Sequence, residues 1–208
     1  MIDLSLIDRT KTNAIVIRHA DRDKMEIHQT EQPLNKLGEK NAFELGKKLQ
    51  GFKKYVLFSS PVDRCQGTAD FIQRGLGFKE NINILSNILG KPGPFVVDHK
   101  NNAFRTYGCK TVVEKQIAHE KLEGIRATQE GSKILIDFVT GEMNKVEPGT
   151  LLIFITHDAV VGPIIFELTC EKFNHEHWPD FSDGFIVEKD ESEFKIIRNK
   201  KIFNLREF

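Results

Sequence analysis

The sequence is poor in cysteine and in every aromatic residue except phenylalanine. Its 208 residues include 3 cysteines, 1 tryptophan and 2 tyrosines, against 16 phenylalanines. The cysteines, Cys65, Cys109 and Cys170, form no closely spaced pair and cannot all be paired within the chain. This argues against a disulfide scaffold and favours a reducing compartment, so we expect a cytoplasmic protein.

The sequence also lacks an excess of charge and a long apolar run. Its 30 basic and 30 acidic residues cancel, so no overall field would gather nucleic acid or an anionic membrane surface. No stretch reaches the roughly 18 apolar residues of a membrane span. Charged residues interrupt the segment 1–11, which is unlike a secretory signal. We therefore expect neither a nucleic-acid partner nor a membrane partner.

The chain does contain an alternation of short apolar strands and amphipathic helices. Continuous apolar, largely β-branched runs predict strands at 13–18, 55–59, 82–85 and 150–156. Helical spacing and glycine or proline punctuation predict helices at 35–49, 62–75, 111–126, 129–144 and 159–168. This alternation indicates an α/β fold, a three-layer sandwich whose mostly parallel central sheet carries helices on both faces. We expect residues 1–208 to form a single domain.

Two segments depart from the alternation. Glycine, proline and asparagine are frequent between 86 and 108, which predicts a long loop, and we expect the segment 86–126 to form a small lid inserted into the domain. Near the end of the chain, apolar runs at 184–189 and 193–198 flank Asp190-Glu191-Ser192. This pattern predicts an antiparallel hairpin at an edge of the sheet.

Polar side chains occupy the carboxyl ends of three predicted strands. The first ends in Arg18-His19, the second runs into Ser59-Ser60-Pro61 with Arg64 one helical turn later, and the fourth ends in Thr156-His157-Asp158. Because the carboxyl ends of parallel strands meet at one edge of a sheet, we expect these groups to converge. Guanidinium groups match phosphoryl oxygens and keep their charge, while a helix N-terminus adds backbone donors. The cluster therefore predicts a phosphate site.

Four motifs in a fixed order extend this pattern from about residue 13 to about residue 168. They are Arg18-His19-Ala20-Asp21-Arg22, residues 33–42 with Leu45-Gly46, Ser59-Ser60-Pro61-Val62-Asp63-Arg64 with Thr68-Ala69, and Thr156-His157-Asp158. With these motifs the chain resembles the histidine phosphatase superfamily, the group of phosphoglycerate mutase-like and histidine acid phosphatase-like proteins. The resemblance implies a phosphoglycerate mutase-like fold.

The resemblance also implies roles for the matched residues. His19 is expected to be the nucleophile that forms a phosphohistidine, while Arg18, Arg64 and His157 bind the phosphoryl oxygens. His157 is thus counted with both the catalytic and the phosphate-binding residues. No metal or other cofactor is implied, because the arginines supply the positive charge that the transition state requires.

Arg22 and Asp158 match the acid phosphatase branch of the family. Arg22 matches an additional phosphate-binding arginine, although it has a simpler alternative as a surface partner of Asp21 or Asp23. Asp158 matches the aspartate that protonates the leaving group and then acts as a base toward water. This residue has a structural alternative as a helix cap.

The general acid has a second set of candidates. In the other branch of the family the acid is usually a glutamate from the insertion that follows the second strand unit. No clear match to that motif occurs between 85 and 126, although Glu114 and Glu120 lie in this segment. We favour Asp158.

These observations predict a metal-independent phosphatase that hydrolyses a phosphomonoester through a phosphohistidine. A phosphorylated small molecule is the favoured substrate, and a phosphohistidine or other phosphoprotein is the alternative. Two further alternatives are a phosphoglycerate mutase-like transferase, whose lid must grip a second anion, and a module that binds phosphate without turnover. The oligomeric state is not predicted.

Three further features have both a functional and a structural interpretation. His175-Glu176-His177 is interpreted as a surface loop and not as a metal site, because no third ligand is evident. Gly38 and Gly46 are expected to allow close packing of a helix on the sheet. A set of aromatic and basic residues is expected either to line the mouth of the site or to form a small satellite core. Its members are Phe95, Phe104, Tyr107, Lys91, Lys100, Arg105 and Lys110.

Overall fold

The computed structural model describes residues 2–23, 32–79, 82–98, 100, 102–174 and 176–205. The strands are β1 (Thr12–Arg18), β2 (Lys54–Ser59), β3 (Asn83–Leu85), β4 (Thr150–Thr156), β5 (Gly184–Asp190), β6 (Glu193–Arg198) and β7 (Lys201–Asn204). The helices are α1 (Lys36–Lys48), α2 (Asp63–Leu76), α3 (Ala103–Ile117), α4 (Thr128–Met143) and α5 (Asp158–Thr169), with a 3₁₀ turn, η1 (Asn87–Leu89). None of the described helices has the length and apolar character that crossing a membrane requires.

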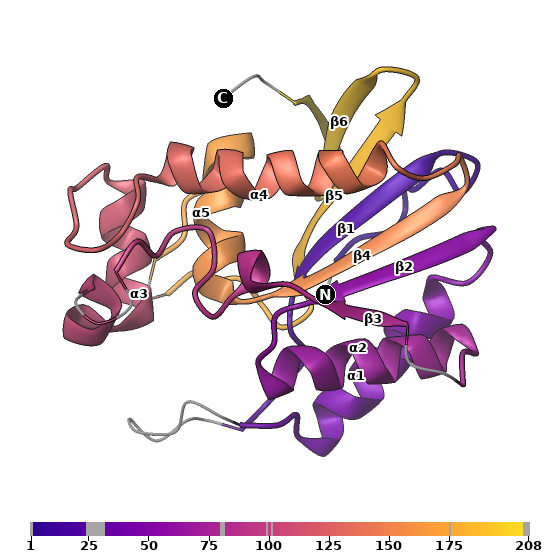
Figure 1. Cartoon of the computed structure of the whole chain (residues 1–208), viewed down its shortest axis with the longest axis horizontal. Helices are drawn as coiled ribbons and strands as arrows, with labels where there is room; N and C mark the ends of the chain where they lie inside the picture. Colours follow the sequence, from indigo (N-terminus) through magenta and orange to yellow (C-terminus); the bar gives the residue numbers. More distant parts are fainter. Residues whose placement is uncertain are drawn as a thin grey trace.

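The strands form one mixed sheet in the order β3-β2-β4-β1-β5-β6-β7. The strands β3, β2, β4 and β1 are parallel to one another, while β5, β6 and β7 are added in antiparallel fashion. Figure 1 shows α1 and α2 on one side of the sheet and α4 and α5 on the other. The predicted three-layer α/β fold, with a parallel centre and an antiparallel hairpin beside it, is confirmed.

The alternation of side chains along the central strands builds a core on each face of the sheet. On β1, Ala14 and Val16 join the cluster that includes α4 and α5, whereas Ile15 and Ile17 join the cluster that includes α1 and α2. All four side chains are completely buried. A continuous apolar run is required here because β1 is covered on both faces and paired on both edges.

Two elements differ from the predicted ones. The helix expected at 111–126 instead starts at Ala103 and ends at Ile117, with a backbone break at Gly108, whose φ is 75°. The strand β7, the last of the three antiparallel strands, was not predicted. It follows a turn at Asn199 and Lys200, which both have positive φ, and neither residue is the glycine that usually marks such a turn.

The segment 86–126, predicted to be a lid, contains η1 and α3. The helix α3 packs against α5, and η1 lies against β4 and α4. Figure 1 places α3 beyond the carboxyl ends of the parallel strands. The role of this segment as a lid, and the count of one domain, stay predictions.

Glycines bring α1 and α2 into close contact. A Cβ atom at Gly46 would overlap the carbonyl oxygen of Ile72, and a Cβ atom at Gly75 would overlap that of Phe43. Gly46 therefore allows one helix to pack on another helix, and not on the sheet as predicted. Gly38 has a different neighbour, because a Cβ atom there would overlap the backbone of Asp21 in the loop after β1.

We expect Gly46→Ala to lower the free energy of unfolding by about 2 kcal/mol, because the added methyl forces two backbones apart. Chemical denaturation with a two-state fit measures this value. The matched control is Gly141→Ala in the last turn of α4, where a Cβ atom meets nothing within 4 Å. This control should be neutral or stabilising by about 0.5 kcal/mol. Equal effects of the two substitutions would contradict the packing argument.

Candidate active site

Arg18 and His19 lie where β1 leaves the sheet. The backbone N–H of His19 donates to the carbonyl of Thr156 at 2.9 Å, which ties the residue to the end of the neighbouring β4. The side chain is almost completely buried, and its Nδ1 lies 2.9 Å from the carbonyl oxygen of Ala20. The ring is therefore fixed in orientation, with Nε2 as its remaining nitrogen.

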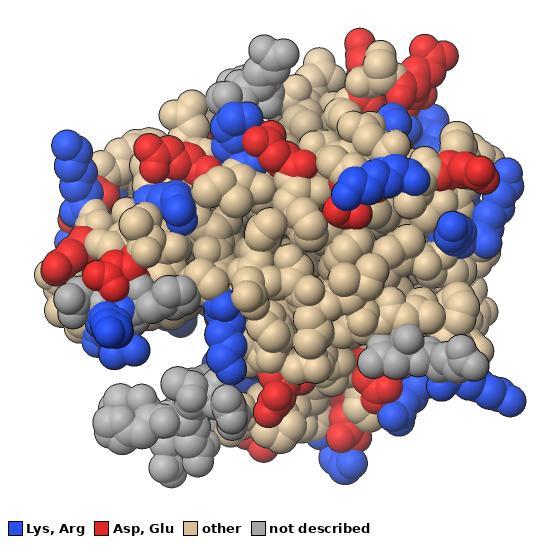
Figure 2. All heavy atoms as spheres, in the orientation of Figure 1, with Lys and Arg blue, Asp and Glu red and all other residues tan. Residues whose placement is uncertain are grey.

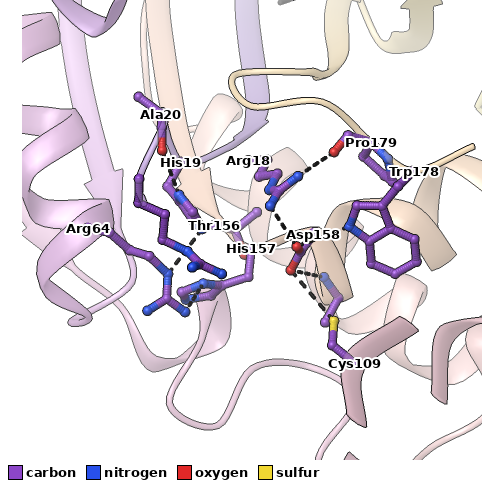
Figure 3. Close-up of polar contacts among 12 residues, drawn as sticks. Arg18, His19, Ala20, Arg64, Cys109, Thr156, His157, Asp158, Trp178 and Pro179 are labelled. Carbon is purple, nitrogen blue, oxygen red and sulfur yellow. Dashed lines mark hydrogen bonds and ion pairs between the residues drawn. The ribbon is translucent and has the colours of Figure 1, made fainter. Parts of the chain in front are cut away.

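Arg64 contacts both histidines of the site (Figure 3). Its Nε donates to His19 Nε2 at 3.0 Å, and its Nη2 lies 3.1 Å from His157 Nδ1. A guanidinium only donates, so each of these ring nitrogens must be the acceptor that carries a lone pair. His19 is consequently protonated on Nδ1, which donates to Ala20, and His157 is protonated on Nε2.

The hydroxyl of Ser60 and the close backbone of Gly90 hold the ring of His157 in place. Its Nε2 lies 3.0 Å from Ser60 Oγ, which accepts the ring proton, and 3.6 Å from the sulfur of Cys65. Gly90 backs the ring, because a Cβ atom at this position would come within 2.6 Å of the ring and 2.7 Å of Ser60 Oγ. The imidazole has no room to rotate away from Arg64.

Burial and positive charge keep both imidazoles neutral. Burial is the main cause that lowers the pKa of His19 well below 6.5, and the neighbouring His157 and the arginines lower it further. Burial and then the Arg64 guanidinium lower the pKa of His157 to about 3. A neutral His19 with its lone pair on Nε2 has the protonation state of a nucleophile.

Asp158 forms an ion pair with Arg18 and accepts three hydrogen bonds. Its Oδ2 lies 2.9 Å from Arg18 Nη2 and 3.1 Å from the indole nitrogen of Trp178. Its Oδ1 accepts from the backbone N–H of Ala159 at 2.9 Å and from the sulfur of Cys109 at 3.7 Å. The N-cap of α5 is His157, without a side-chain bond, so Asp158 is not the helix cap of the structural alternative; it lies in the first turn and accepts one backbone N–H there. Asp158 also contacts Arg18, the arginine predicted to bind phosphate.

The charge state of Asp158 follows from these donors. Burial alone would raise the pKa of the carboxyl group. The positive charge of Arg18, the neighbouring His19 and the N–H of Trp178 together outweigh burial and hold the pKa well below its usual range. Asp158 is therefore a carboxylate in the free protein. The thiol of Cys109 beside it is protonated, because burial and the carboxylate raise its pKa.

A cavity of about 680 Å³ opens over these groups. Its polar end is lined by Arg22, Arg64, His157 and Asp158. In Figure 2 the surface is hollowed between α3 and the start of α2, with basic side chains at the border of the hollow. Arg22 Nη1 donates to the backbone carbonyl of Asp23. Among the described residues, no ion pair joins Arg22 to a neighbouring aspartate. Burial and the nearby Arg64 lower the pKa of Arg22.

The structure brings all six predicted site residues together. His19, Arg64 and His157 contact one another, Arg18 contacts Asp158, and Arg22 lines the same cavity as Arg64. The register of the sheet explains this, because Arg18 pairs with Thr156 and Ser59 pairs with Ile155. The roles assigned to these residues remain predictions.

Some of the other predicted residues line the cavity and others do not. The cavity is lined by Lys91, Phe95 and Phe104 of the aromatic and basic set, and not by the other members, which are Tyr107, Lys100, Arg105 and Lys110. Neither Glu114 nor Glu120 lines it. His175 lies outside the described residues, and among those described no group of three or more histidine, cysteine or acidic side chains could hold a metal ion.

Four residues of the site were not predicted as such. Ser60 was named above only as part of the Ser59-Ser60-Pro61 motif, without a role of its own; its Oγ contacts His157, while the N-cap of α2 is Val62. Cys109 and Trp178 reach Asp158 from segments far away in the sequence. Only the rarity of tryptophan sets Trp178 apart in the sequence. Gly90 looked like part of an irregular loop.

The sequence matches the family model of the histidine phosphatase superfamily (branch 1) over residues 14–87. This match contains Arg18, His19 and Arg64. The segment 14–87 is thus similar to the histidine phosphatase superfamily. No curated protein matches the chain. His157 and Asp158 lie beyond the matched segment, so their assignment depends on the geometry described above.

Solved structures of the phosphoglycerate mutase-like type share the fold over most of their length. YhfR of Bacillus stearothermophilus is 16% identical, with a TM-score of 0.63, and the match covers 91% of this chain and 96% of that one. A phosphoglycerate mutase from Bacillus anthracis is 14% identical, with a TM-score of 0.61 and coverages of 92% and 95%. The mycobacterial glucosyl-3-phosphoglycerate phosphatase Rv2419c is 12% identical, with a TM-score of 0.55 and coverages of 85% and 88%.

We expect NMR spectra that correlate ring protons with ring nitrogens to show opposite neutral tautomers for the two histidines at about pH 6. His19 should carry its proton on Nδ1 and His157 on Nε2. Because the pKa of both rings is lowered, neither should become charged as the pH falls from about 8 to about 5 in phosphate-free buffer.

The variant Arg64→Met is the control for this measurement. Loss of the guanidinium removes a positive charge that lowers the pKa of both rings, so both pKa values should rise while the rings stay buried. A ring that titrates near 6.5 in the unmodified protein would show that the assigned hydrogen bonds are wrong.

Proposed function

We propose that the protein is a phosphoric monoester hydrolase that forms a phosphohistidine on His19. The observation that carries the proposal is the hydrogen bond from Arg64 to Nε2 of a buried, neutral His19. This bond directs the nucleophilic lone pair toward a fixed cation. A phosphoryl oxygen that accepts from Arg64 in place of Nε2 would break this bond and free the lone pair beside phosphorus.

The cation cluster suits a phosphoryl group with its several oxygens. Within the described residues, the buried Nε atoms of Arg18 and Arg22 have no hydrogen-bond acceptor. Buried donors of this kind favour an anionic ligand, and guanidinium groups bind phosphoryl oxygens with good geometry. Of the residues that the structure describes, Asp158 is the one carboxylate that lines the same cavity and balances the positive charge.

In the first step the lone pair of His19 Nε2 attacks phosphorus, and the bond from phosphorus to the ester oxygen breaks. The leaving oxygen takes up a proton and departs as an alcohol. Positive charge on the imidazole is delocalised toward Nδ1–H, which the carbonyl of Ala20 accepts. The arginines stabilise the charge on the phosphoryl oxygens through the transition state.

Asp158 is proposed to pass the proton to the leaving oxygen. It is ionised in the free protein, so the proton arrives with the substrate, as the monoanion of the phosphate ester. The negative charge of a bound phosphate also raises the pKa of a neighbouring carboxyl and competes for Arg18, and both effects favour proton uptake by Asp158. None of the other described residues that line the cavity is a carboxylate.

In the second step a water molecule attacks phosphorus and the bond from phosphorus to Nε2 breaks. Asp158 takes a proton from the water, and inorganic phosphate leaves with that proton. One ester and one water thus give one alcohol and one phosphate. The protein returns to its starting protonation state.

Hydrolysis is favoured over transfer to a second bound molecule. A mutase-like enzyme needs cations that grip a second anion within a closed site. Beyond the phosphate end, the cavity wall is largely apolar. A phosphoprotein is disfavoured as the substrate because a volume of about 680 Å³ is typical of sites for small molecules. A module that only binds phosphate would have no need of an activated Nε2.

We expect the purified protein to release phosphate from p-nitrophenyl phosphate at a rate that does not change with a chelator, because arginines supply the positive charge. His19→Ala should lower the rate by about 10³-fold or more. The matched control is His119→Asn, an exposed histidine with positive φ, which asparagine tolerates, and this variant should keep full activity.

Rapid quenching should trap a phosphorylated protein whose label is lost in acid and kept in alkali, as expected of phosphohistidine. Activity that survives in His19→Ala would overturn the proposal. Tight phosphate binding without any turnover would favour the binding module.

For Asp158 we expect a dependence on the leaving group. Asp158→Asn should slow alkyl phosphates by about 10²-fold or more, because alkoxides need a proton, and should slow p-nitrophenyl phosphate by less than about tenfold. The substitution also breaks the ion pair with Arg18, but that loss affects both substrates alike. The ratio of kcat/KM values therefore isolates proton transfer. Equal slowing of both esters would rule out Asp158 as the acid.

A further inference from the structure

The cavity has two chemically different parts. The phosphate end described above is charged, whereas the remaining wall is built from apolar side chains that come from separate elements. These are Val62 at the N-cap of α2, Phe95 and Val96 before α3, Phe104 on α3, and Val160 on α5.

The apolar wall is firmly supported. Phe95 is 2% exposed, and a Cβ atom at Gly131 of α4 would overlap its ring. Val160 is also buried, in the first turn of α5, two residues after Asp158. Phe95 and Val160 are therefore part of the packed core that reaches the cavity, while Val62, Val96 and Phe104 are half-buried.

Charge is scarce on this wall. Among the described lining residues outside the phosphate end, Lys91 is the one charged side chain, and it is exposed. A substrate with a second anionic group would have to desolvate that group against valine and phenylalanine. Apolar groups gain free energy from the same contact.

We propose that this wall binds the alcohol part of the substrate, so that the enzyme is selective for phosphomonoesters of apolar alcohols. This inference rests on the proposed function for its chemistry, and it adds the substrate class. The ester oxygen must face Asp158 to receive a proton. Asp158 lies at the junction of the two parts, so the carbon chain continues onto the apolar wall.

Binding of alkylphosphonates tests the wall without turnover, because their bond from carbon to phosphorus is not hydrolysed by this chemistry. We expect the affinity to rise about threefold per methylene from ethylphosphonate to hexylphosphonate, as measured by calorimetry. Hexylphosphonate should bind at least about tenfold more tightly than 5-phosphonopentanoate, which has similar length but ends in a carboxylate. Turnover of the matching alkyl phosphates should show the same order in kcat/KM.

Substitutions at the wall test whether it causes the gain in affinity per methylene. Phe104→Ala should reduce the gain per methylene, whereas Tyr107→Ala, one turn further along α3 and outside the cavity lining, should leave it unchanged. Val62→Thr is a second test that keeps the side-chain shape and suits an N-cap, so the protein should fold. It should weaken hexylphosphonate more than ethylphosphonate.

The outcomes separate this inference from the proposed function. Affinity that does not change with chain length, or that is higher for the carboxylate, overturns the inference even if esters are hydrolysed. Affinity that rises with chain length supports the inference. If no ester is then hydrolysed, the proposed hydrolase is wrong while the apolar binding wall stands.

Discussion

The hydrogen bond from Arg64 to His19 Nε2 is the interaction on which the site depends. One planar cation reaches two imidazoles, and since it can only donate, it determines which nitrogen of each ring carries a proton. Burial then makes the neutral forms the stable ones. If Arg64 were removed, the tautomer of His157 would no longer be specified, because the hydroxyl of Ser60 can donate or accept, whereas the carbonyl of Ala20 would still hold the proton of His19 on Nδ1.

The sheet supplies the frame for this contact. Because β1, β4 and β2 are neighbours and parallel, the residues after their carboxyl ends lie within reach of one another although about 140 positions separate Arg18 from His157 in the sequence. The antiparallel strands on the far side of β1 contribute in a second way. The segment before β5 brings Trp178 to Asp158 and the carbonyl of Pro179 to Arg18. The charged cluster is thus held from both sides of the central strand.

Sequence reasoning predicted the fold and the convergence of the strand-end residues because both depend on local patterns, namely apolar runs that end in Arg18-His19, Ser59-Ser60 and Thr156-His157-Asp158. Arg22 was added only by the family resemblance. Sequence reasoning did not predict the features that depend on tertiary contacts. The break at Gly108 divides α3 into two helical pieces, and no local pattern indicated that the first piece, which starts at Ala103, is helical. The contact of Trp178 with Asp158 has no sequence signal, since it joins a loop to a helix start. The charge state of Asp158 was also beyond the sequence, because the pairing with Arg18 that lowers its pKa is a matter of geometry.

The carboxylate of Asp158 joins four segments of the chain: β1 through Arg18, α3 through Cys109, its own helix through Ala159, and the loop of Trp178. A protonated carboxyl oxygen gives up part of its accepting capacity, so a proton on this group must weaken at least one of these four ties. The weakest is the sulfur contact, at 3.7 Å. Protonation of Asp158 and its hydrogen bond with Cys109 of α3 are therefore thermodynamically linked. The helix that carries Phe104 is held most firmly when the carboxylate is charged.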